Sequence, residues 1–393
     1  MTAPRMAVVT TAHAWGDPRV FERELATCLE WGVAVHVFVP LAGGASTQPR
    51  IRGGWGGHPN LTIHPLPRSR GRLGRLVLAL RAGCQVLARG PWTLVQFHDP
   101  ELIPVMALFG LLRPGSYTLC DLHEDLPLQV AAKPYLPPWI RPPMVRLVEL
   151  MLRMARELFS GFAPATEAIA RNWPADRTRV VHNYPKAVFA QALADPDPTR
   201  VLYVGGLSRA RGILVVLEAV AAVRAWQVQH PSGALPMRLE LVGWVLEPEV
   251  GAAIQAAVAE GWCRHIPWLT PEALAGHAAG AGIGLATLLP MPNYLEALPT
   301  KLFEYMAMGI PILASDFPLW RRLVAGAGAG QVTAPTPGAV AEALLRMGSD
   351  PAELAACARR GRAAYRDRYR WEVESRNLRW HLQQAGLLPP LEA

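Results

Sequence analysis

Short apolar runs that alternate with amphipathic helical patterns are the feature that most limits the fold of this chain. The runs expected to be β-strands are residues 7–11, 33–39, 61–66, 93–97, 116–122, 200–204, 238–242, 282–286 and 310–314. A further strand is expected near residues 265–268. Helical patterns separate these runs, as in residues 71–88, where leucine and valine recur on one face. Because parallel strands need long crossover connections, this alternation predicts an α/β fold with doubly wound parallel sheets.

The length of the chain predicts two domains. A chain of 393 residues is too long for one compact core, and a polar, proline-containing stretch at 194–199 interrupts the alternation. We therefore expect two Rossmann-like domains, residues 1–190 and 191–370, and a C-terminal helix within 371–393. In open α/β sheets, ligands bind beyond the carboxyl ends of the strands, so two such edges that face each other would form a cleft.

The apolar runs, the N-terminal segment and the cysteines bear on the cellular compartment of the protein. No apolar run reaches the ~18 residues that a membrane helix needs, and the N-terminus leads into the first strand without a signal-peptide pattern. These patterns predict a cytosolic protein. The five cysteines are scattered without metal-ligand spacing, so we expect reduced and mostly buried thiols.

The net charge of +8 is unevenly distributed. No acidic residue lies between Trp31 and His98, whereas eight arginines lie between Arg50 and Arg89. Helical patterns at 68–89 and 144–156 combine an apolar face with arginine. Two interpretations stay open: helices packed on a sheet, or helices that attach the protein to the anionic inner face of the cell membrane. No helix-turn-helix, zinc-finger or aromatic RNA-binding pattern points to nucleic acid.

The segment 296–309 carries the clearest site pattern. Pro299 precedes a predicted helix that ends at Gly309. Glu296 stands just before this helix, and Glu304 lies about one turn inside it. The unpaired backbone N–H groups at the helix start favour a phosphate group. These groups belong to Thr300, Lys301 and Leu302. The alternative is an ordinary amphipathic helix with incidental glutamates.

A glycine-rich turn, residues 204–212, follows a predicted strand in the second domain. Glycine lets the backbone approach a pyrophosphate, and one arginine can donate two parallel hydrogen bonds to two phosphate oxygens. The candidate phosphate-binding residues are Gly206, Arg209 and Arg211, with Lys301 as an added positive charge. Surface charge is the alternative for Arg209 and Lys301.

Two predicted strands in the first domain end on polar side chains, His98-Asp99 and His123-Glu124. The carboxyl ends of parallel strands form the ligand-binding edge of a sheet, so these four side chains are candidates for a site. A structural hydrogen-bonding role is the alternative for each histidine. The four together also form a conceivable transition-metal set.

The loop between the first strand and the first helix is a further candidate. Gly16 permits close approach of the backbone to a ligand. Asp17 is equally suited to cap the following helix, with Pro18 at the first helical position.

The segment 298–316, LPTKLFEYMAMGIPILASD, preceded by a glutamate eight positions before Glu304, resembles the donor site of the retaining GT4 glycosyltransferases. The two strand ends with histidine, and the loop after Asp17, resemble the N-terminal domain of the same family. The resemblance implies the GT-B architecture, with an acceptor-binding first domain and a nucleotide-sugar-binding second domain. It also implies a C-terminal helix that crosses back to the first domain, and a site without a metal or other cofactor.

The resemblance also implies roles for single residues. Glu296 would contact the hydroxyls of the donor sugar, and His123 would lie near the transferred carbon; these two are the catalytic candidates. The nucleotide-sugar-binding candidates are Gly16, Gly206, Arg209, Arg211, Thr300, Lys301, Leu302 and Glu304. The acceptor-binding candidates are His98, Asp99 and Glu124. The chain departs from the family pattern at Ala297, where many members have glycine, and at Gly206, where an arginine is typical.

These observations predict a retaining glycosyltransferase that moves a sugar from a nucleoside-diphosphate sugar to an acceptor hydroxyl. A glycan, a small molecule, or a lipid-linked or polysaccharide-precursor acceptor of bacterial envelope synthesis fits the resemblance. Two alternatives stay open: a nucleotide-sugar 2-epimerase, and a non-catalytic protein that binds a nucleotide sugar and stabilises a transferase.

Overall fold

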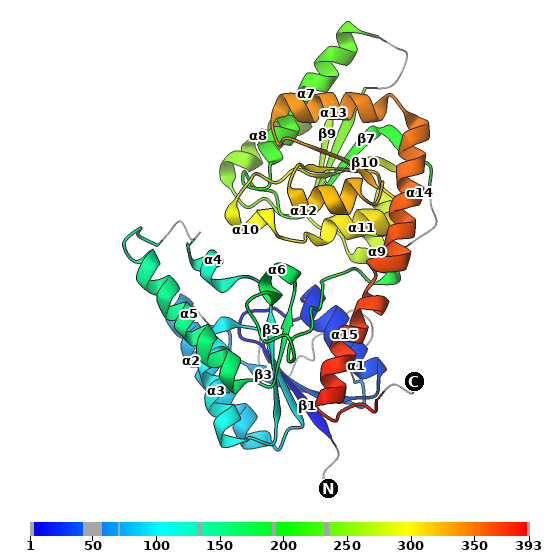
Figure 1. Cartoon of the computed structure of the whole chain (residues 1–393). Coiled ribbons are helices and arrows are strands. Elements are labelled where there is room, and N and C mark those ends of the chain that lie inside the picture. Colours follow the sequence, from blue (N-terminus) through cyan, green and yellow to red (C-terminus); the bar gives the residue numbers. More distant parts are fainter. Residues whose placement is uncertain are drawn as a thin grey trace. The chain divides into compact units, whose positions relative to one another are not determined.

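The computed structural model describes residues 4–41, 57–69, 71–131, 136–190, 194–231 and 236–390, and the structural statements below concern these residues. The chain divides into two compact units, Met1–Asn183 with Glu374–Ala393, and Tyr184–Val373 (Figure 1). The first boundary lies seven residues before the one expected from the sequence, and the second lies three residues after it. Three arginines of the acid-free run, Arg50, Arg52 and Arg70, lie outside the described residues.

The first unit is built on a six-stranded parallel sheet in the order β3-β2-β1-β4-β5-β6. Its strands are β1 (Arg5–Val9), β2 (Ala34–Pro40), β3 (Leu61–Leu66), β4 (Leu94–Phe97), β5 (Tyr117–Leu122) and β6 (Gly161–Pro164). Its helices are η1 (Pro18–Leu25), α1 (Ala26–Glu30), α2 (Gly71–Arg89), η2 (Pro100–Leu102), α3 (Ile103–Leu112), α4 (Leu126–Ala131), α5 (Arg141–Leu158) and α6 (Glu167–Ala170). Apolar side chains of α2, α3 and α5 pack on the sheet around Phe97, Phe109 and Phe162.

The second unit repeats this plan with the strand order β12-β11-β10-β7-β8-β9, again parallel throughout. Its strands are β7 (Asp197–Val204), β8 (Arg238–Val242), β9 (Cys263–Ile266), β10 (Ala281–Ala286), β11 (Ile312–Ser315) and β12 (Gly330–Thr333). Its helices are η3 (Ala187–Phe189), α7 (Ile213–Gln229), α8 (Pro248–Ala259), α9 (Pro271–Ala278), α10 (Pro292–Leu295), α11 (Thr300–Met308), α12 (Pro318–Trp320), η4 (Arg321–Ala325), α13 (Pro337–Gly348) and α14 (Pro351–Arg368). The expected α/β class with two doubly wound parallel sheets is therefore confirmed.

Both sheets contain a topological switch point. The chain builds one half of each sheet outward from β1 or β7, and then returns to the centre to build the other half from β4 or β10. The loops that follow these central strands diverge to opposite faces, which leaves a crevice at the carboxyl ends of the strands. The sheet order thus places one candidate ligand site in each unit.

Three local features differ from the sequence prediction. The first helix, expected after Asp17, is a π-helical segment, η1, that continues into the short α1. The edge strands β6 and β12 were not expected, because each is four residues long and contains glycine or proline. Short edge strands with such residues lack the alternation that marks longer strands.

The last helix, α15 (Trp371–Gln384), carries the chain into the first unit, which includes residues 374–393. Glu374 accepts a hydrogen bond from the backbone N–H of His182 at 2.9 Å, and Tyr117 Oη lies 3.2 Å from His381 Nδ1. The packing of α15 on the strands and loops of the first unit therefore includes specific polar contacts. No helix among the described residues is long and apolar enough to cross a membrane.

Gly212, directly before α7, is a position where the backbone of the second unit requires glycine. Its φ of +77° lies in the left-handed region, and a Cβ added there would lie 1.9 Å from the carbonyl oxygen of Thr287. Gly261 has a similar φ of +79° but no atom within 4 Å of an added Cβ. Alanine substitutions at Gly212 and Gly261 therefore share the cost of the left-handed backbone, and only the one at Gly212 adds a steric overlap.

We predict that Gly212→Ala lowers the free energy of unfolding by more than ~2 kcal/mol, because the left-handed conformation and the overlap both oppose a side chain. The control Gly261→Ala should cost only about 1 kcal/mol. Urea unfolding followed by circular dichroism measures both. Equal losses for the two variants would contradict the steric role of Gly212.

Candidate functional site

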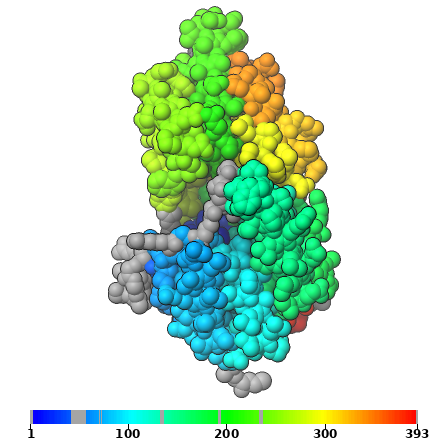
Figure 2. All heavy atoms as spheres, turned by 90° about the vertical axis from the view of Figure 1, so that its left-hand side faces the viewer, coloured from blue at the N-terminus to red at the C-terminus, as the bar shows by residue number. Residues whose placement is uncertain are grey.

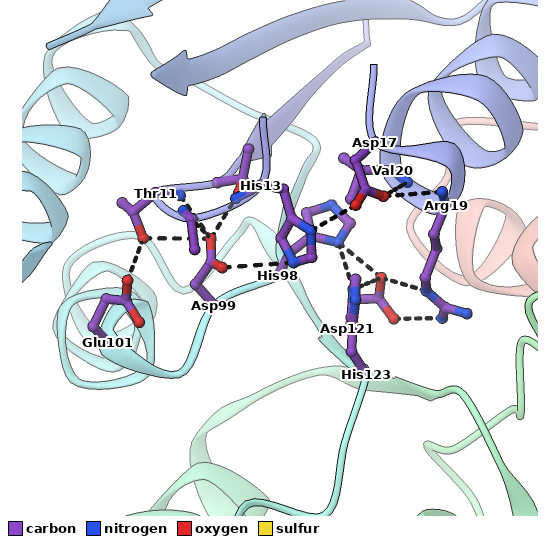
Figure 3. A network of polar contacts seen from close by, with 12 residues as sticks. Thr11, His13, Asp17, Arg19, Val20, His98, Asp99, Glu101, Asp121 and His123 are labelled. Carbon is purple, nitrogen blue, oxygen red and sulfur yellow. Dashed lines mark hydrogen bonds and ion pairs between the residues drawn. The ribbon is translucent and has the colours of Figure 1, made fainter. Parts of the chain in front are cut away.

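A buried polar network lies at the carboxyl ends of β1, β4 and β5 in the first unit (Figure 3). Asp121 belongs to the end of β5, and His123 follows it. His98 and Asp99 follow β4, and the loop between β1 and η1 adds His13. Because these strands are neighbours at the switch point, side chains that are far apart in the sequence meet there.

The centre of the network is an ion pair between Arg19 and Asp121. Arg19 Nε lies 3.1 Å from Asp121 Oδ2, and Arg19 Nη2 lies 2.6 Å from Asp121 Oδ1. The same guanidinium donates to the carbonyl of Val181 at 2.6 Å and lies 3.1 Å from a carboxylate oxygen of Glu24. Burial would raise the pKa of Asp121, but Arg19 and His123 outweigh this effect and hold the pKa well below its usual range. Asp121 is therefore an anion inside the protein.

Two histidines share one oxygen of this carboxylate. Asp121 Oδ2 lies 2.7 Å from His98 Nδ1 and 2.9 Å from His123 Nε2. Because a carboxylate only accepts, the hydrogen bonds assign the N–H of His123 to Nε2 and leave Nδ1 as an acceptor. Burial lowers the pKa of His123, against the opposing effect of Asp121. His123 is therefore a neutral imidazole near pH 7, suited to accept a hydrogen bond from a hydroxyl.

His13 completes the group of three imidazoles. Its ring centroid lies 4.6 Å from that of His123, and its Nδ1 lies 3.0 Å from Asp17 Oδ2. Burial would lower the pKa of His13, but the hydrogen bond to Asp17 and the charge of Asp99 raise it above the ordinary value. A readily protonated imidazole thus stands beside the neutral His123.

Asp99 and Asp17 are held by the backbone around them. Asp99 Oδ2 accepts hydrogen bonds from Thr10 Oγ1 at 2.7 Å and from the backbone N–H of Thr11 at 2.6 Å. Asp17 accepts from the backbone N–H groups of Arg19 and Val20, which confirms the predicted helix cap. Asp99 therefore orders the loop after β1, in addition to facing the site.

A pocket of about 620 Å³ opens beside this network, within the first unit. Its polar wall is lined by His13, Arg75, His98, Asp99, Glu101, Asp121, His123, Glu124 and Gln129. Its apolar wall is lined by Leu76, Ile103, Leu122, Leu126, Met144 and Val148. The predicted acceptor residues His98, Asp99 and Glu124 therefore line one pocket together with His123. A ligand with both a polar and an apolar part fits this lining.

The network also contains a set of groups that a metal ion could use. The nearest ligand atoms of His98, Asp121 and His123 lie within 4.8 Å of one another. Arg19, however, already binds both oxygens of Asp121 and neutralises its charge. The donor set therefore fits an internal ion pair better than a divalent cation. The metal set considered from the sequence also contained Asp99 and Glu124. In the structure Asp99 accepts a hydrogen bond from Thr10, and the exposed Glu124 accepts one from Gln129, so neither belongs to the group of three.

A second candidate site lies at the end of β7 in the second unit. Gly205 and Gly206 follow this strand, and a Cβ added at Gly205 would lie 3.4 Å from Lys301 Nζ and 3.6 Å from Arg211 Nη1. Two cationic side chains from different elements therefore converge on the glycine turn. The structure therefore places Gly206, Arg211 and Lys301 close to one another.

Lys301 is buried, with 5% of its surface exposed. Its Nζ lies 3.6 Å from the centroid of the Tyr203 ring and has no hydrogen-bond partner among the described residues. Burial lowers the pKa of Lys301 well below its usual range, Arg211 lowers it further, and Glu304 acts in the opposite direction. The alternative of a solvent-facing lysine is therefore wrong.

Helix α11 runs from Thr300 to Met308 and is stopped by Gly309, whose φ is +68°, as the sequence predicts. No side chain caps its N-terminus. The N–H of Leu302 donates to the carbonyl of Pro299 at 3.1 Å. The expectation that Leu302 offers a free N–H is therefore wrong, because the first turn closes on itself. The N–H groups of Thr300 and Lys301 precede that turn.

The remaining predicted donor residues have different surroundings. Glu296 is exposed at the end of α10, and Glu304 is partly buried in α11. Arg209 is exposed and pairs with Glu249. Gly16 has a φ of +89° and open space around it, in the loop before η1. The predicted part of these four residues in binding the nucleotide sugar therefore stays a prediction.

The most important residues that the sequence reasoning missed are Arg19, Asp121 and His13. Asp121 lies inside an apolar strand pattern, so its sequence context gave only the signal of one charged residue at a buried position. A charge in a buried strand needs a partner, and that rule alone would have singled it out. Nothing in the sequence identifies Arg19 as this partner, because 102 residues separate the two.

We predict that Asp121→Asn lowers the free energy of unfolding by about 3–5 kcal/mol, because it leaves Arg19 as a buried charge without its anionic partner. It should also raise the fraction of His123 that carries its proton on Nδ1 instead of Nε2. The matched control is Asp125→Asn, next to the same pocket but only partly buried, which should change stability by less than ~1 kcal/mol. Urea unfolding of both variants tests the difference, and a stable Asp121→Asn protein would contradict the central role of the ion pair.

The comparisons with known proteins agree with this architecture. Residues 198–350 match the family model of glycosyl transferases group 1. No curated protein matches the chain. Sucrose-phosphate synthase from Thermosynechococcus elongatus is similar in structure, with a TM-score of 0.73, 18% identity, and coverage of 97% of this chain and 98% of that chain.

Two further solved structures are similar over nearly the whole chain. HepE from Anabaena, in complex with UDP, gives a TM-score of 0.68 at 15% identity and covers 97% of this chain and 100% of its own. A UDP-forming trehalose-phosphate synthase from Burkholderia xenovorans, in complex with glucose-6-phosphate, gives 0.67 at 14% identity, with 96% and 100% covered. The chain therefore has the GT-B fold, and its residues 198–350 are similar to the glycosyl transferases group 1.

Proposed function

We propose that this protein is a retaining glycosyltransferase of the GT4 type, which moves a sugar from a nucleoside-diphosphate sugar to an acceptor hydroxyl. The observation that carries the proposal is the pair of Lys301 and Arg211 at the glycine turn after β7. A buried amine without a hydrogen-bond partner is costly unless a ligand satisfies it. A diphosphate satisfies two cations at once, and the family match covers this part of the chain.

The donor would bind to the second unit through main chain and side chains together. Gly206 permits close approach, Arg211 and Lys301 neutralise the diphosphate, and the start of α11 at Thr300 adds N–H groups. Glu296 would accept hydrogen bonds from the sugar hydroxyls, and Glu304 from the ribose. The UDP bound to HepE makes UDP-sugars the first donors to test.

The nucleobase has candidate surfaces of its own. Trp244 and Trp268, 60% and 45% exposed, follow the ends of β8 and β9, next to the glycine turn along the sheet. An exposed tryptophan face offers a base a stacking surface with little selectivity for its identity. We therefore expect selectivity for the base to come from polar atoms of the loops beside these side chains.

The acceptor would bind to the first unit, in the pocket that His98, Asp99, His123 and Glu124 line. Its hydroxyl would donate a hydrogen bond to the neutral His123. In the reaction the bond between the anomeric carbon and the diphosphate oxygen breaks, and the acceptor oxygen bonds to the same face of that carbon. The hydroxyl proton passes to the departing phosphate, whose growing charge Arg211 and Lys301 stabilise.

The proposal extends to the acceptor and the compartment. A lipid-linked or polysaccharide-precursor acceptor of envelope synthesis suits the mixed lining of the pocket, and we propose a cytoplasmic location at the inner face of the membrane. The cations at the glycine turn take the part that a metal would otherwise play. We therefore propose that transfer requires no metal ion or other cofactor.

We predict that Glu296→Ala reduces transfer by about 100-fold or more, because hydrogen bonds to the sugar would be lost in the transition state. Its melting temperature should be unchanged, since Glu296 is exposed. Glu342→Ala, which removes an exposed glutamate from α13, is the control and should keep full activity. Product formation from a labelled UDP-sugar measures transfer, and a fully active Glu296→Ala enzyme would refute the proposal.

We predict that donor binding takes up a proton at Lys301. The empty site depresses the pKa of this amine, whereas a bound diphosphate would favour the charged form. Affinity for UDP should therefore fall as the pH rises above the pKa of the empty site, and it should be independent of pH below that value.

Isothermal titration calorimetry in buffers of different ionisation enthalpy measures the proton uptake. Lys301→Met should weaken UDP binding by about tenfold or more and abolish the uptake. Arg264→Met, at an exposed site on β9 of the same unit, should do neither. Unchanged uptake in Lys301→Met would assign the proton to another group.

The two rival functions are separated by simple assays. A 2-epimerase would convert a UDP-sugar to its epimer without an acceptor. A non-catalytic partner would bind the donor, as seen in a thermal-shift screen with UDP, GDP and ADP sugars, without transfer or hydrolysis over a broad panel of acceptors.

A further inference from the structure

Three helices of the first unit expose an unusual number of large apolar side chains. α2, α3 and α5 lie side by side, since α3 packs against both of the others, and Figure 2 shows them on one face of that unit. Most of the exposed large apolar side chains of the described residues lie between Leu73 and Met154. We call the following set the apolar face: Leu73, Leu76, Val77, Leu80, Leu108, Leu111, Leu112, Leu147, Leu150 and Met154.

The spacing shows that the apolar face is a property of whole helices. Leu73 and Leu80 are seven residues apart on α2, and Leu147 and Met154 are seven apart on α5, so each pair lies on one side of its helix. Leu73 is 80% exposed and Leu147 is 60% exposed. Scattered apolar side chains on a surface need no explanation, but stripes on adjacent helices form a continuous patch, which marks an interaction site.

Helix α3 strengthens this conclusion, because it has no charged residue over Ile103–Leu112. One side of α3 is buried on the sheet through Met106 and Phe109. Its other side exposes Leu108 and Leu111, at 57% and 65%. A helix that is apolar on its outer side as well as its inner side is unfavourable in water, and it is expected where another apolar phase covers it.

The charges around the apolar face select the kind of partner. Exposed arginines border it at Arg81, Arg113, Arg146 and Arg153. The only acidic residues within the three helices are Glu149 and Glu157, both on α5. Arginine beside exposed leucine is the composition that binds the interface of an anionic bilayer, where apolar side chains enter the acyl region and cations meet the headgroups.

The apolar face is also continuous with the pocket of the first unit. Leu76 belongs to both, and Met144 and Val148 of α5 line the pocket, about one helical turn before Leu147 and directly after it. The apolar wall of the pocket therefore leads from the face toward the polar wall with His123. A molecule that is anchored in a bilayer at the face can reach the pocket with its polar end.

We propose that the apolar face binds an anionic lipid bilayer, and that the pocket receives the headgroup of an amphiphilic acceptor held in that bilayer. The second part rests on the proposed glycosyl transfer, whereas the first part does not. The face then has two tasks: it holds the protein at the membrane, and it brings the acceptor hydroxyl to His123 without removing the apolar chain from the lipid.

Vesicle co-sedimentation tests the bilayer. The full chain should bind vesicles of phosphatidylcholine mixed with phosphatidylglycerol, bind pure phosphatidylcholine vesicles much more weakly, and dissociate as salt is raised. The triple variant Leu73→Glu, Leu80→Glu, Leu147→Glu should lose at least about tenfold in partitioning. Arg146→Gln with Arg153→Gln should weaken binding to the anionic vesicles by several-fold and leave the weak binding to neutral vesicles unchanged.

The matched control is Trp226→Glu with Val228→Glu, which places the same charges at exposed apolar sites of α7, in the second unit. This control should bind vesicles like the wild type, and melting temperatures confirm that the variants fold. Wild-type protein that ignores anionic vesicles at low salt, or a triple variant that binds them normally, would overturn the proposal. Light scattering provides a further test. If the wild type is a dimer and only the triple variant is a monomer, a second copy of the chain covers the apolar face, and the bilayer proposal is overturned.

A donor assay keeps the two proposals distinguishable. The thermal shift caused by UDP should be the same in the wild type and the triple variant, because the substitutions lie in the first unit. Vesicle binding without a response to any nucleotide would leave the bilayer proposal intact and refute the proposed transfer. With transfer established, an acceptor of fixed headgroup should be used much faster when its chain anchors it in anionic vesicles. Equal rates for a soluble short-chain form would overturn the assignment of the pocket.

Discussion

The buried ion pair between Arg19 and Asp121 organises the polar half of the first unit. It joins the helix after β1 to the end of β5, and its carboxylate orients His98 and His123 through one shared oxygen. Removing such a charge from water is costly, so the geometry persists because every partner is present. The tautomer of His123, the position of His98 and the polar wall of the pocket all follow from this one contact.

The fold could be predicted from the sequence to a large extent, because most strands are long apolar runs and most helices have a clear periodicity. β3 and β8 begin and end where the pattern places them. The misses have a physical cause: β6 and β12 are short edge strands, and the π-helical η1 includes Arg19, whose partner Asp121 lies far away in the sequence. Propensity carries no information on such contacts.

The residues of the candidate sites also divide into those that local sequence patterns reveal and those that only tertiary contacts bring together. Residues within one segment, such as Gly206 with Arg211 or Thr300 with Glu304, could be found from local spacing. The convergence of Lys301 on the glycine turn could not, because about ninety positions separate the two segments and the side chain points inward over Tyr203. The typical arginine is absent at Gly206, and a lysine from another element lies beside that turn.

The loops after β7, β8 and β10 approach one another closely through their main chains. A Cβ at Gly243 would lie 1.9 Å from the carbonyl oxygen of Gly205, as one at Gly212 would from that of Thr287. Evolution can therefore exchange the side chains that project from these loops while the backbone cradle stays the same. Within such a scaffold, the proposed selectivity for a nucleobase can change through polar atoms of the loops beside Trp244 and Trp268, without disturbing the backbone contacts that hold the cradle together.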